Sequence, residues 1–335
     1  MSLSLMPDIV KETTFQNMDI TGLLLLVNQS DEFKSDLRRY RMKNCTFSCR
    51  MIEQTNDIFV TYRSEVNVHR FSFFKPEHGQ YFLENRETVA LRKLGNLEME
   101  GTSVFEGSWE FVYSEIFNPM IEVIQHLRDL FPDITIESLE IQFDCIPDID
   151  VLCTALSNLS CTSLCLNMAG ENLEEKAKRL LSCLTDLEYL QLRVFHSHFD
   201  LDQPLYADKI EISTAKWVNN QKLMTWRFRS AKLSNTCYTN ENYVEFINLW
   251  MAGEFPNMEK MTMVWNEREV NRETVIRLTG GEEWDERKME GKPKGTGRFL
   301  KHCYHRSDGK IGVIRTFGQY FKFYVWTGKE VEDSD

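Results

Sequence analysis

Short apolar strings of the kind that form buried strands recur through the second half of the chain, and they constrain its fold more than any other feature. Their cores begin, in order, at Leu139, Leu164, Leu190, Ile210 and Met261. Successive starts therefore lie 25, 26, 20 and 51 residues apart, and the long last interval predicts a further strand near Trp226–Phe228. Strands that alternate with longer intervals predict a mixed fold, α/β in this half and α+β overall.

The intervals between these strings carry helical patterns. The clearest interval places five apolar residues on one face of a helix, at Leu173, Ala177, Leu180, Leu181 and Leu184. Strand–helix units of about 20–29 residues have the size of leucine-rich repeats, which stack into a solenoid. The Asn position of that consensus is missing. We therefore predict a repeat-like, leucine-rich-repeat-like strand–helix array over residues 132–265, with helices over at least one face of its parallel strands.

The preceding segment, residues 44–131, is predicted to be rich in strands. Apolar and polar residues alternate in Ile58–Tyr62 and in Val66–Phe71, and Trp109–Tyr113 has the composition of a further strand. A helix is expected between that strand and Pro132, because apolar residues there fall near helical spacing.

The last segment, residues 266–335, differs again. Gly280–Gly297 is rich in Gly, Glu and Lys, which indicates an exposed loop. The turn Ser307–Lys310 contains Asp-Gly, and it precedes two alternating strings, Ile311–Phe317 and Tyr320–Trp326. This arrangement predicts a C-terminal β-hairpin.

The first 43 residues predict a compact helical hairpin. Pro7 suits a first helical position, and Asp19 and Ser30 can each cap a following helix. About forty residues cannot bury enough surface to be stable alone. We therefore expect this segment to pack on the rest of the chain or to dock into a partner.

This segment resembles an F-box, because Met6-Pro7, Met18-Asp19 and Ser30 fall where that family has its Leu-Pro, Leu-Asp and late Ser. The resemblance implies binding to the Skp-type adaptor of a cullin-RING ubiquitin ligase. The implied adaptor-binding residues are Met6, Pro7, Ile9, Phe15, Met18, Leu23 and Leu26. Departures from the family pattern at Met6, Thr14 and Gly22 leave two alternatives open, an ordinary helical cap and a decayed F-box.

A second resemblance lies in Phe246-x-x-x-Trp250-x-x-Gly253-x-x-Pro256, which places two aromatic residues one helical turn apart before a helix stop. The string is similar to the type 2 F-box-associated domain of the family expanded in nematodes, and the likeness extends roughly over residues 187–326. The positions that carry it are Trp217, Phe246, Trp250, Gly253, Pro256, Gly309, Phe317, Gly318 and Trp326. Phe246 and Trp250 are expected to be core residues.

Composition narrows the function classes. The chain has 335 residues and a net charge of −12, which argues against nucleic-acid binding through phosphate neutralisation. No stretch approaches the ~20 apolar residues that cross a bilayer, so no membrane partner is expected. Nine scattered cysteines and the lack of a leader pattern predict an intracellular protein, cytoplasmic, nuclear or both.

We found no strong signature of catalysis or of a cofactor. His196 and His198 with Asp200 and Asp202 invite a metal interpretation, but no second close ligand pair supports it. Gly291–Gly297 lacks the order of a phosphate-binding loop. We expect no metal and no cofactor. The Cys45/Cys49 and Cys161/Cys165 pairs have neither redox nor zinc spacing and are expected to pack in strands.

The sequence thus predicts a non-catalytic substrate-recognition subunit of a Skp–cullin–F-box type ubiquitin ligase. Its N-terminus would bind the adaptor, and its C-terminal domain would bind a protein target. The alternatives are an interaction domain with a decayed F-box and an enzyme on an α/β scaffold. Target recognition is expected on loops, with Phe195–Tyr206 and Gly280–Gly297, which contains Trp284, as candidates.

Overall fold

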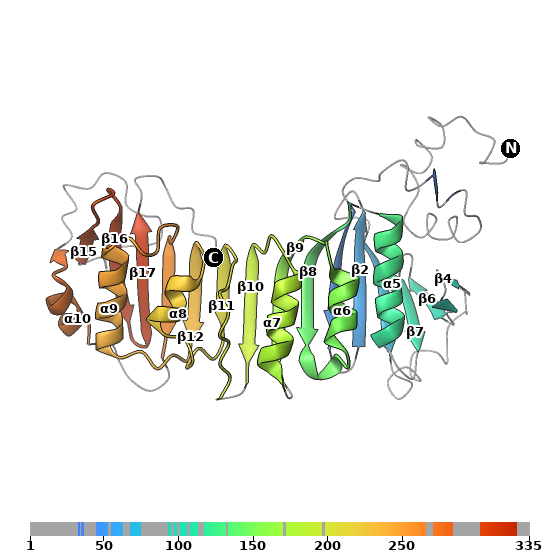
Figure 1. Ribbon diagram of the computed structural model, residues 1–335, viewed down its shortest axis with the longest axis horizontal. Helices are drawn as coiled ribbons and strands as arrows, with labels where there is room; N and C mark the ends of the chain where they lie inside the picture. Colours follow the sequence, from blue (N-terminus) through green and yellow to red (C-terminus); the bar gives the residue numbers. More distant parts are fainter. Residues whose placement is uncertain are drawn as a thin grey trace. The chain divides into compact units, whose positions relative to one another are not determined.

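The computed structural model describes residues 33, 35–36, 45–52, 55–62, 68–74, 93–94, 97–98, 101–105, 108–112, 117–131, 133–169, 172–195, 198–265, 271–283 and 302–326. The chain divides into two compact units, residues 1–187 (unit 1) and residues 188–335 (unit 2). Each unit combines a sheet with helices (Figure 1), so the predicted mixed class is confirmed. The predicted N-terminal helical hairpin lies outside the described residues, except for Phe33, Ser35 and Asp36.

Unit 1 is built on a mixed sheet whose strands lie in the order β9-β8-β1-β2-β3-β7-β6. Its strands are β1 (Cys45–Met51), β2 (Thr55–Tyr62), β3 (Val68–Phe74), β6 (Gly101–Phe105), β7 (Ser108–Val112), β8 (Thr135–Gln142) and β9 (Cys161–Met168), with a separate small pair, β4 (Lys93–Leu94) and β5 (Leu97–Glu98). β1, β8 and β9 are parallel to one another, whereas β2 is antiparallel to β1.

The helices of unit 1 are α5 (Phe117–Leu130), α6 (Ile149–Leu156) and α7 (Leu173–Cys183), with a 3-10 turn, η2 (Phe143–Cys145). α5 packs on the sheet through its apolar face, where Cys49 Sγ of β1 lies 3.8 Å from Met120 Sδ. Asp148 caps α6, because its carboxylate accepts from the backbone N–H groups of Asp150 and Val151.

Unit 2 contains a sheet with the strand order β10-β11-β12-β13-β17-β16-β15-β14. Its strands are β10 (Tyr189–Val194), β11 (Lys209–Ile212), β12 (Ser230–Ser234), β13 (Lys260–Val264), β14 (Glu282–Glu283), β15 (His302–His305), β16 (Ile311–Phe317) and β17 (Tyr320–Trp326). The first four are parallel, and β17 then joins β13 in the antiparallel direction. The predicted hairpin is therefore the pair β16–β17.

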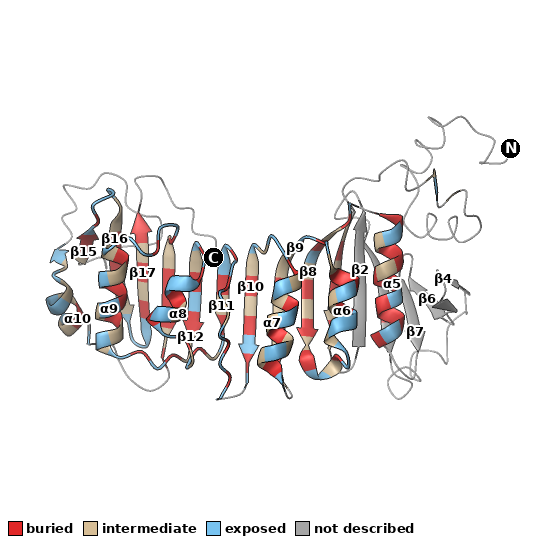
Figure 2. Ribbon diagram, in the orientation of Figure 1, coloured by how far each residue is buried: buried red, intermediate tan, exposed pale blue. Residues whose placement is uncertain are grey.

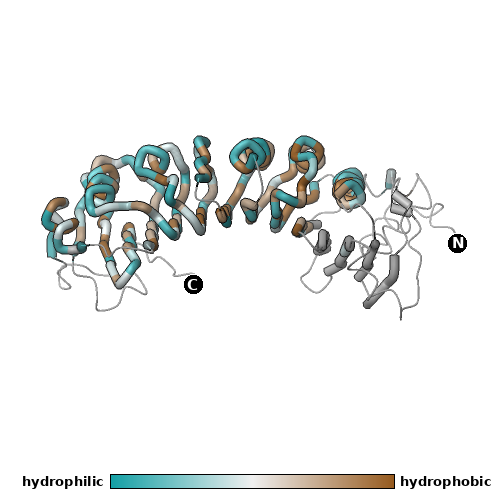
Figure 3. Tube along the Cα trace, turned by 90° about the horizontal axis from the view of Figure 1, so that it is seen from below, coloured by the Kyte–Doolittle hydropathy of each residue, from teal (hydrophilic) through white to brown (hydrophobic). Residues whose placement is uncertain are grey.

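The helices of unit 2 are α8 (Asn220–Thr225), α9 (Asn240–Met251) and α10 (Arg272–Thr279). α8 and α9 lie on one side of the strands, as Figure 3 shows end-on, and α10 packs beside α9. Buried and accessible residues alternate along β10–β12 and most of β17 (Figure 2), and the buried set of β10–β13 and β17 faces the helices, whereas Cys303 and Val313 form a separate buried cluster on the opposite side. We call this side of the unit 2 sheet the covered face and the opposite side the open face.

The further strand predicted near Trp226–Phe228 is present as β12, which begins two residues later, at Ser230. Trp226 and Phe228 are buried, but they belong to the connection before the strand, where the Arg227 backbone N–H donates to the Leu205 carbonyl at 2.8 Å. Apolar residues buried in a connection produced the same sequence signal as a strand core.

In the part of the chain that the structure describes, no helix is long and apolar enough to span a membrane.

Candidate interaction surface

α9 carries the aromatic residues of the motif around Trp250. A capping box starts the helix, in which the Thr239 backbone N–H donates to Asn242 Oδ1 at 2.9 Å. The spacing of Tyr243, Phe246 and Trp250 then places their rings on one face, and all three are fully buried. Phe246 and Trp250 therefore lie in the core, as expected from the sequence.

These rings pack against β17. The centroid of the Tyr243 ring lies 4.3 Å from that of Phe321, and the centroid of Trp250 lies 5.0 Å from that of Phe323, at an edge-to-face angle of 66°. Gly312 of β16 leaves room for this contact, since a Cβ atom there would collide with the rings of Phe323 and Trp250. Helix α9 and the hairpin β16–β17 thus form one packing unit.

The end of α9 has the geometry that its sequence predicts. Gly253 has φ +97°, a left-handed conformation that favours glycine, and its N–H donates to the Trp250 carbonyl at 3.0 Å. Pro256 follows in the connection to β13 and contributes a carbonyl that accepts from the Lys310 ammonium. Gly253 and Pro256 thus direct the chain from the helix into the strand.

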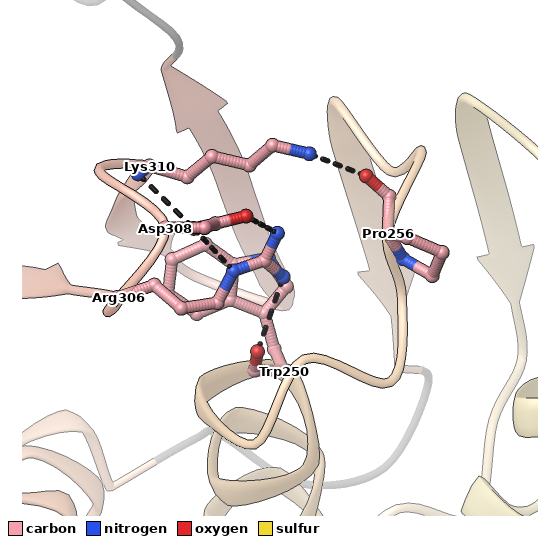
Figure 4. A network of polar contacts seen from close by, with 5 residues as sticks. All are labelled: Trp250, Pro256, Arg306, Asp308 and Lys310. Carbon is pink, nitrogen blue, oxygen red and sulfur yellow. Dashed lines mark hydrogen bonds and ion pairs between the residues drawn. The ribbon is translucent and has the colours of Figure 1, made fainter.

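Arg306, just after β15, joins the end of α9 to the turn before β16 (Figure 4). Its Nη1 donates to the Trp250 carbonyl at 3.2 Å, and its guanidinium carbon lies 4.8 Å from the Trp250 ring centroid. Its Nε and Nη2 donate to the two carboxylate oxygens of Asp308 at 2.8 and 2.6 Å. The hydrogen bonds from Arg306 hold the pKa of Asp308 well below its ordinary value. Arg306 thus connects the motif around Trp250 with the turn at Asp308–Lys310, although Arg306 and Trp250 are 56 positions apart in the sequence.

The remaining motif residues take other positions. Trp217 is half-buried and packs edge-on against Phe199, with ring centroids 5.3 Å apart. Gly309 and Gly318 occupy turns with φ of +86° and +52°. Trp326 is 9% exposed at the end of β17, whereas Phe317, at the turn between β16 and β17, is 77% exposed. Among the three aromatic residues of this group, Trp217, Phe317 and Trp326, Phe317 exposes the largest fraction of its side chain to solvent.

All the predicted adaptor-binding residues lie outside the described residues. They are Met6, Pro7, Ile9, Phe15, Met18, Leu23 and Leu26.

The first predicted recognition loop, Phe195–Tyr206, is partly a packing segment. Phe199, Leu201 and Leu205 are buried, while Phe195 and Tyr206 are exposed. The Lys222 ammonium of α8 forms an ion pair with Asp200, so this carboxylate is already engaged. His196 lies outside the described residues, and no group of three or more His, Cys, Asp or Glu able to hold a metal ion occurs within the described part.

The second predicted loop, Gly280–Gly297, is described only through residue 283. Gly280 ends α10 in a left-handed conformation with φ +69°, and its N–H donates to the Ile276 carbonyl at 2.9 Å. Trp284 and the Gly291–Gly297 string lie outside the described residues.

Two shallow hollows occur between neighbouring helices. One, of about 410 Å³, lies between α9 and α10 and is lined by Val244, Leu249 and Leu278 among others. The other, of about 600 Å³, lies between α6 and α7, where Cys153 and Asp150 are among the lining residues. A hydrogen bond between the thiols of Cys153 and Cys183 lowers the pKa of Cys153 and raises the pKa of Cys183. Neither set of described lining residues joins a nucleophile to a base and an oxyanion donor.

The open face of the unit 2 sheet carries a set of cationic residues that our sequence reasoning missed. Six cationic side chains alternate with buried residues along its strands: Arg193, Lys209, Lys232, Lys260, Arg315 and Lys322. We call these six residues the basic face. The signal in the sequence was the period-two placement of single cations between apolar residues, as in Phe321-Lys322-Phe323.

Comparison with known proteins gives one match. The model of the F-box associated family matches residues 186–263, which run from just before β10 nearly to the end of β13. No curated protein and no solved structure matches the chain.

Proposed function

We propose that this chain is the substrate-recognition subunit of a Skp–cullin–F-box type ubiquitin ligase. The observation that carries the proposal is the F-box associated match at residues 186–263, which supports an F-box-associated substrate-binding role for unit 2. The F-box-like pattern at Met6–Ser30 adds the adaptor-binding half, in the order that such proteins use.

In this proposal the protein is intracellular and non-catalytic, and ubiquitin transfer belongs to other subunits. The N-terminus binds the Skp-type adaptor and through it the cullin, while unit 2 binds a protein target. Tethering in this way raises the effective concentration of the target near the charged ubiquitin carrier. No metal, cofactor, nucleic acid or membrane is required.

Adaptor capture tests the proposal. The full chain should co-purify with a Skp-type adaptor, and the double variant Pro7→Ala, Ile9→Asp should abolish capture, since buried apolar contacts at an interface centre contribute about 1 kcal/mol or more each. A matched control, Lys11→Ala with Glu12→Ala, changes neighbouring polar residues and should retain capture.

A lack of adaptor binding by the wild-type chain at micromolar concentration would favour the alternative. The protein would then be an interaction domain with a decayed F-box, in which Met6, Thr14 and Gly22 account for the loss.

A further inference from the structure

Two cysteines lie where the helices α6 and α7 of unit 1 meet. Cys153 is in the middle of α6, and Cys183 is the last residue of α7. The two helices pack side by side (Figure 1), and the Asp150 carboxylate of α6 forms an ion pair with the Arg179 guanidinium of α7. The packing of these helices brings together two thiols that are 30 positions apart in the sequence.

The thiols of Cys153 and Cys183 are in contact. A hydrogen bond joins them, with Cys183 as the donor. The Leu180 carbonyl oxygen, 3.1 Å from Cys183 Sγ, offers the same thiol hydrogen a second acceptor. A disulfide requires a sulfur–sulfur distance of about 2.05 Å, so its formation needs a further approach of two side chains that already interact.

Neither cysteine of this pair is fully buried. Cys153 and Cys183 are both half-buried, and Cys153 lines the hollow of about 600 Å³ between α6 and α7. The neighbouring Cys161 is fully buried in β9, where burial raises the pKa of its thiol to about 12. A small oxidant that enters the hollow therefore meets Cys153, whereas Cys161 is shielded and stays protonated.

The surroundings of Cys153 favour its thiolate, which is the nucleophilic form of cysteine. The hydrogen bond from Cys183 lowers the pKa of Cys153. The Arg179 guanidinium acts in the same direction, whereas burial and the Asp150 carboxylate oppose it. The same hydrogen bond, together with burial, raises the pKa of Cys183. An accessible thiol with a lowered pKa beside a second cysteine is the arrangement of redox-sensing sites.

We propose that Cys153 and Cys183 form an oxidation site, at which a hydroperoxide converts the two thiols into a disulfide that joins α6 to α7. In the first step the Cys153 thiolate attacks the outer oxygen of the hydroperoxide, and the O–O bond breaks. Cys153 becomes a sulfenic acid, and the leaving oxygen takes up a proton to give an alcohol, or water if the oxidant is hydrogen peroxide.

The second step closes the disulfide. Once Cys153 is oxidised, its thiolate no longer accepts the hydrogen bond that raised the pKa of Cys183. The Cys183 sulfur then attacks the sulfur of the sulfenic acid, the S–O bond breaks, and the hydroxide that leaves takes the Cys183 proton to form water. The two sulfurs together lose two electrons, which reduce the O–O bond of the hydroperoxide.

This site is independent of the proposed function, because it lies in unit 1 and needs neither the adaptor nor a target. Disulfides inside the cell are usually transient and redox-sensing. We therefore expect the bond to form on exposure to the oxidant and to be reversed by a thiol reductant.

Treatment of the full chain with hydrogen peroxide, followed by alkylation of the remaining thiols and mass spectrometry of its peptides, tests the proposal. The wild type should give two peptides linked through Cys153 and Cys183, and dithiothreitol should restore both thiols. Cys237→Ser is the matched control, because Cys237 is an exposed free cysteine of unit 2, and it should leave the link unchanged. Absence of the link would overturn the proposal, and so would a link from Cys153 to Cys161 in its place.

Two serine variants test the order of the steps. In Cys183→Ser the sulfenic acid has no second thiol to react with, so dimedone should label Cys153 about tenfold more than Cys237. In Cys153→Ser, Cys183 should stay reduced under the same conditions. Equal labelling of Cys153 and Cys237 would overturn the proposal, as would oxidation of Cys183 without Cys153. Urea midpoints should match the wild type, and the wild-type link is read without any substitution, so a loss of folding in a variant cannot decide the result.

Discussion

The two faces of the unit 2 sheet are built from the same strands and have opposite chemistry. Along β17, Phe321 and Phe323 pack under α9, while Tyr320, Lys322 and Tyr324 stand on the open face. The alternation of a strand thus gives the seven residues of β17 two sides of different chemistry. Substitutions on the two faces should therefore affect different measurements.

The described strands of unit 1 carry a different set of residues on the side away from the helices. At the corresponding alternate positions, β8 carries Glu140 and β9 carries Asn167, whose Nδ2 donates to Glu140 Oε1 at 3.3 Å. Glu140 also pairs in register with Arg50 of β1, so charges of both signs lie on this side of the described strands. Four of the six cations of the basic face, Arg193, Lys209, Lys232 and Lys260, lie within residues 186–263, which match the F-box associated family model.

The largest effect is expected on the covered face, from Trp250→Ala. Removal of a fully buried indole leaves a cavity beside Phe323 and should lower the free energy of unfolding by roughly 3–5 kcal/mol. Urea denaturation followed by fluorescence measures the change. A variant that melts like the wild type but has lost partner binding would instead assign Trp250 to a binding site.

The sequence predicted those parts of unit 2 whose signal is local. The strand at Met261–Met263, the Gly253 helix end and the β16–β17 hairpin each follow from residues within a few positions of one another. The buried residues of the Phe195–Tyr206 loop were missed, because apolar residues scattered among polar ones resemble a solvated loop.

The basic face was missed for a different reason. Lys232 and Lys322 are 90 positions apart in the sequence, and only the register of β12, β13 and β17 makes them neighbours. The assignment of Met6 and Pro7 to an adaptor interface stays a prediction, since both lie outside the described residues.

A smaller effect, with a defined pH dependence, is expected from Asp308→Asn at the edge of the covered face. The variant leaves the buried guanidinium of Arg306 without its carboxylate and should be less stable at neutral pH. The folded-state pKa of Asp308 is lowered, so its stabilisation is present above the ordinary Asp pKa of about 4 and is lost as the pH falls through the lower, folded value.

Urea midpoints measured from neutral to acid pH test this expectation. The difference between wild type and Asp308→Asn should be full near neutrality and should shrink in acid. A difference that stays constant down to the lowest pH at which both proteins fold would show that the charge of Asp308 does not contribute. Ser307→Ala, in the same turn, serves as the control and should show no such pH dependence.

The smallest stability effect is expected on the open face, from Lys232→Ala. The side chain is exposed, and its neighbours in the register are Glu211 and Thr262, so its removal creates no cavity and leaves no buried charge. The free energy of unfolding, measured by urea denaturation, should change by no more than about 0.5 kcal/mol. If the free energy of unfolding instead drops as far as in Asp308→Asn, Lys232 stabilises the sheet. The two faces would then not differ in their contribution to stability. A small change would show that the Lys232 side chain contributes little to the packing of the sheet, because neither face loses a buried group when it is removed.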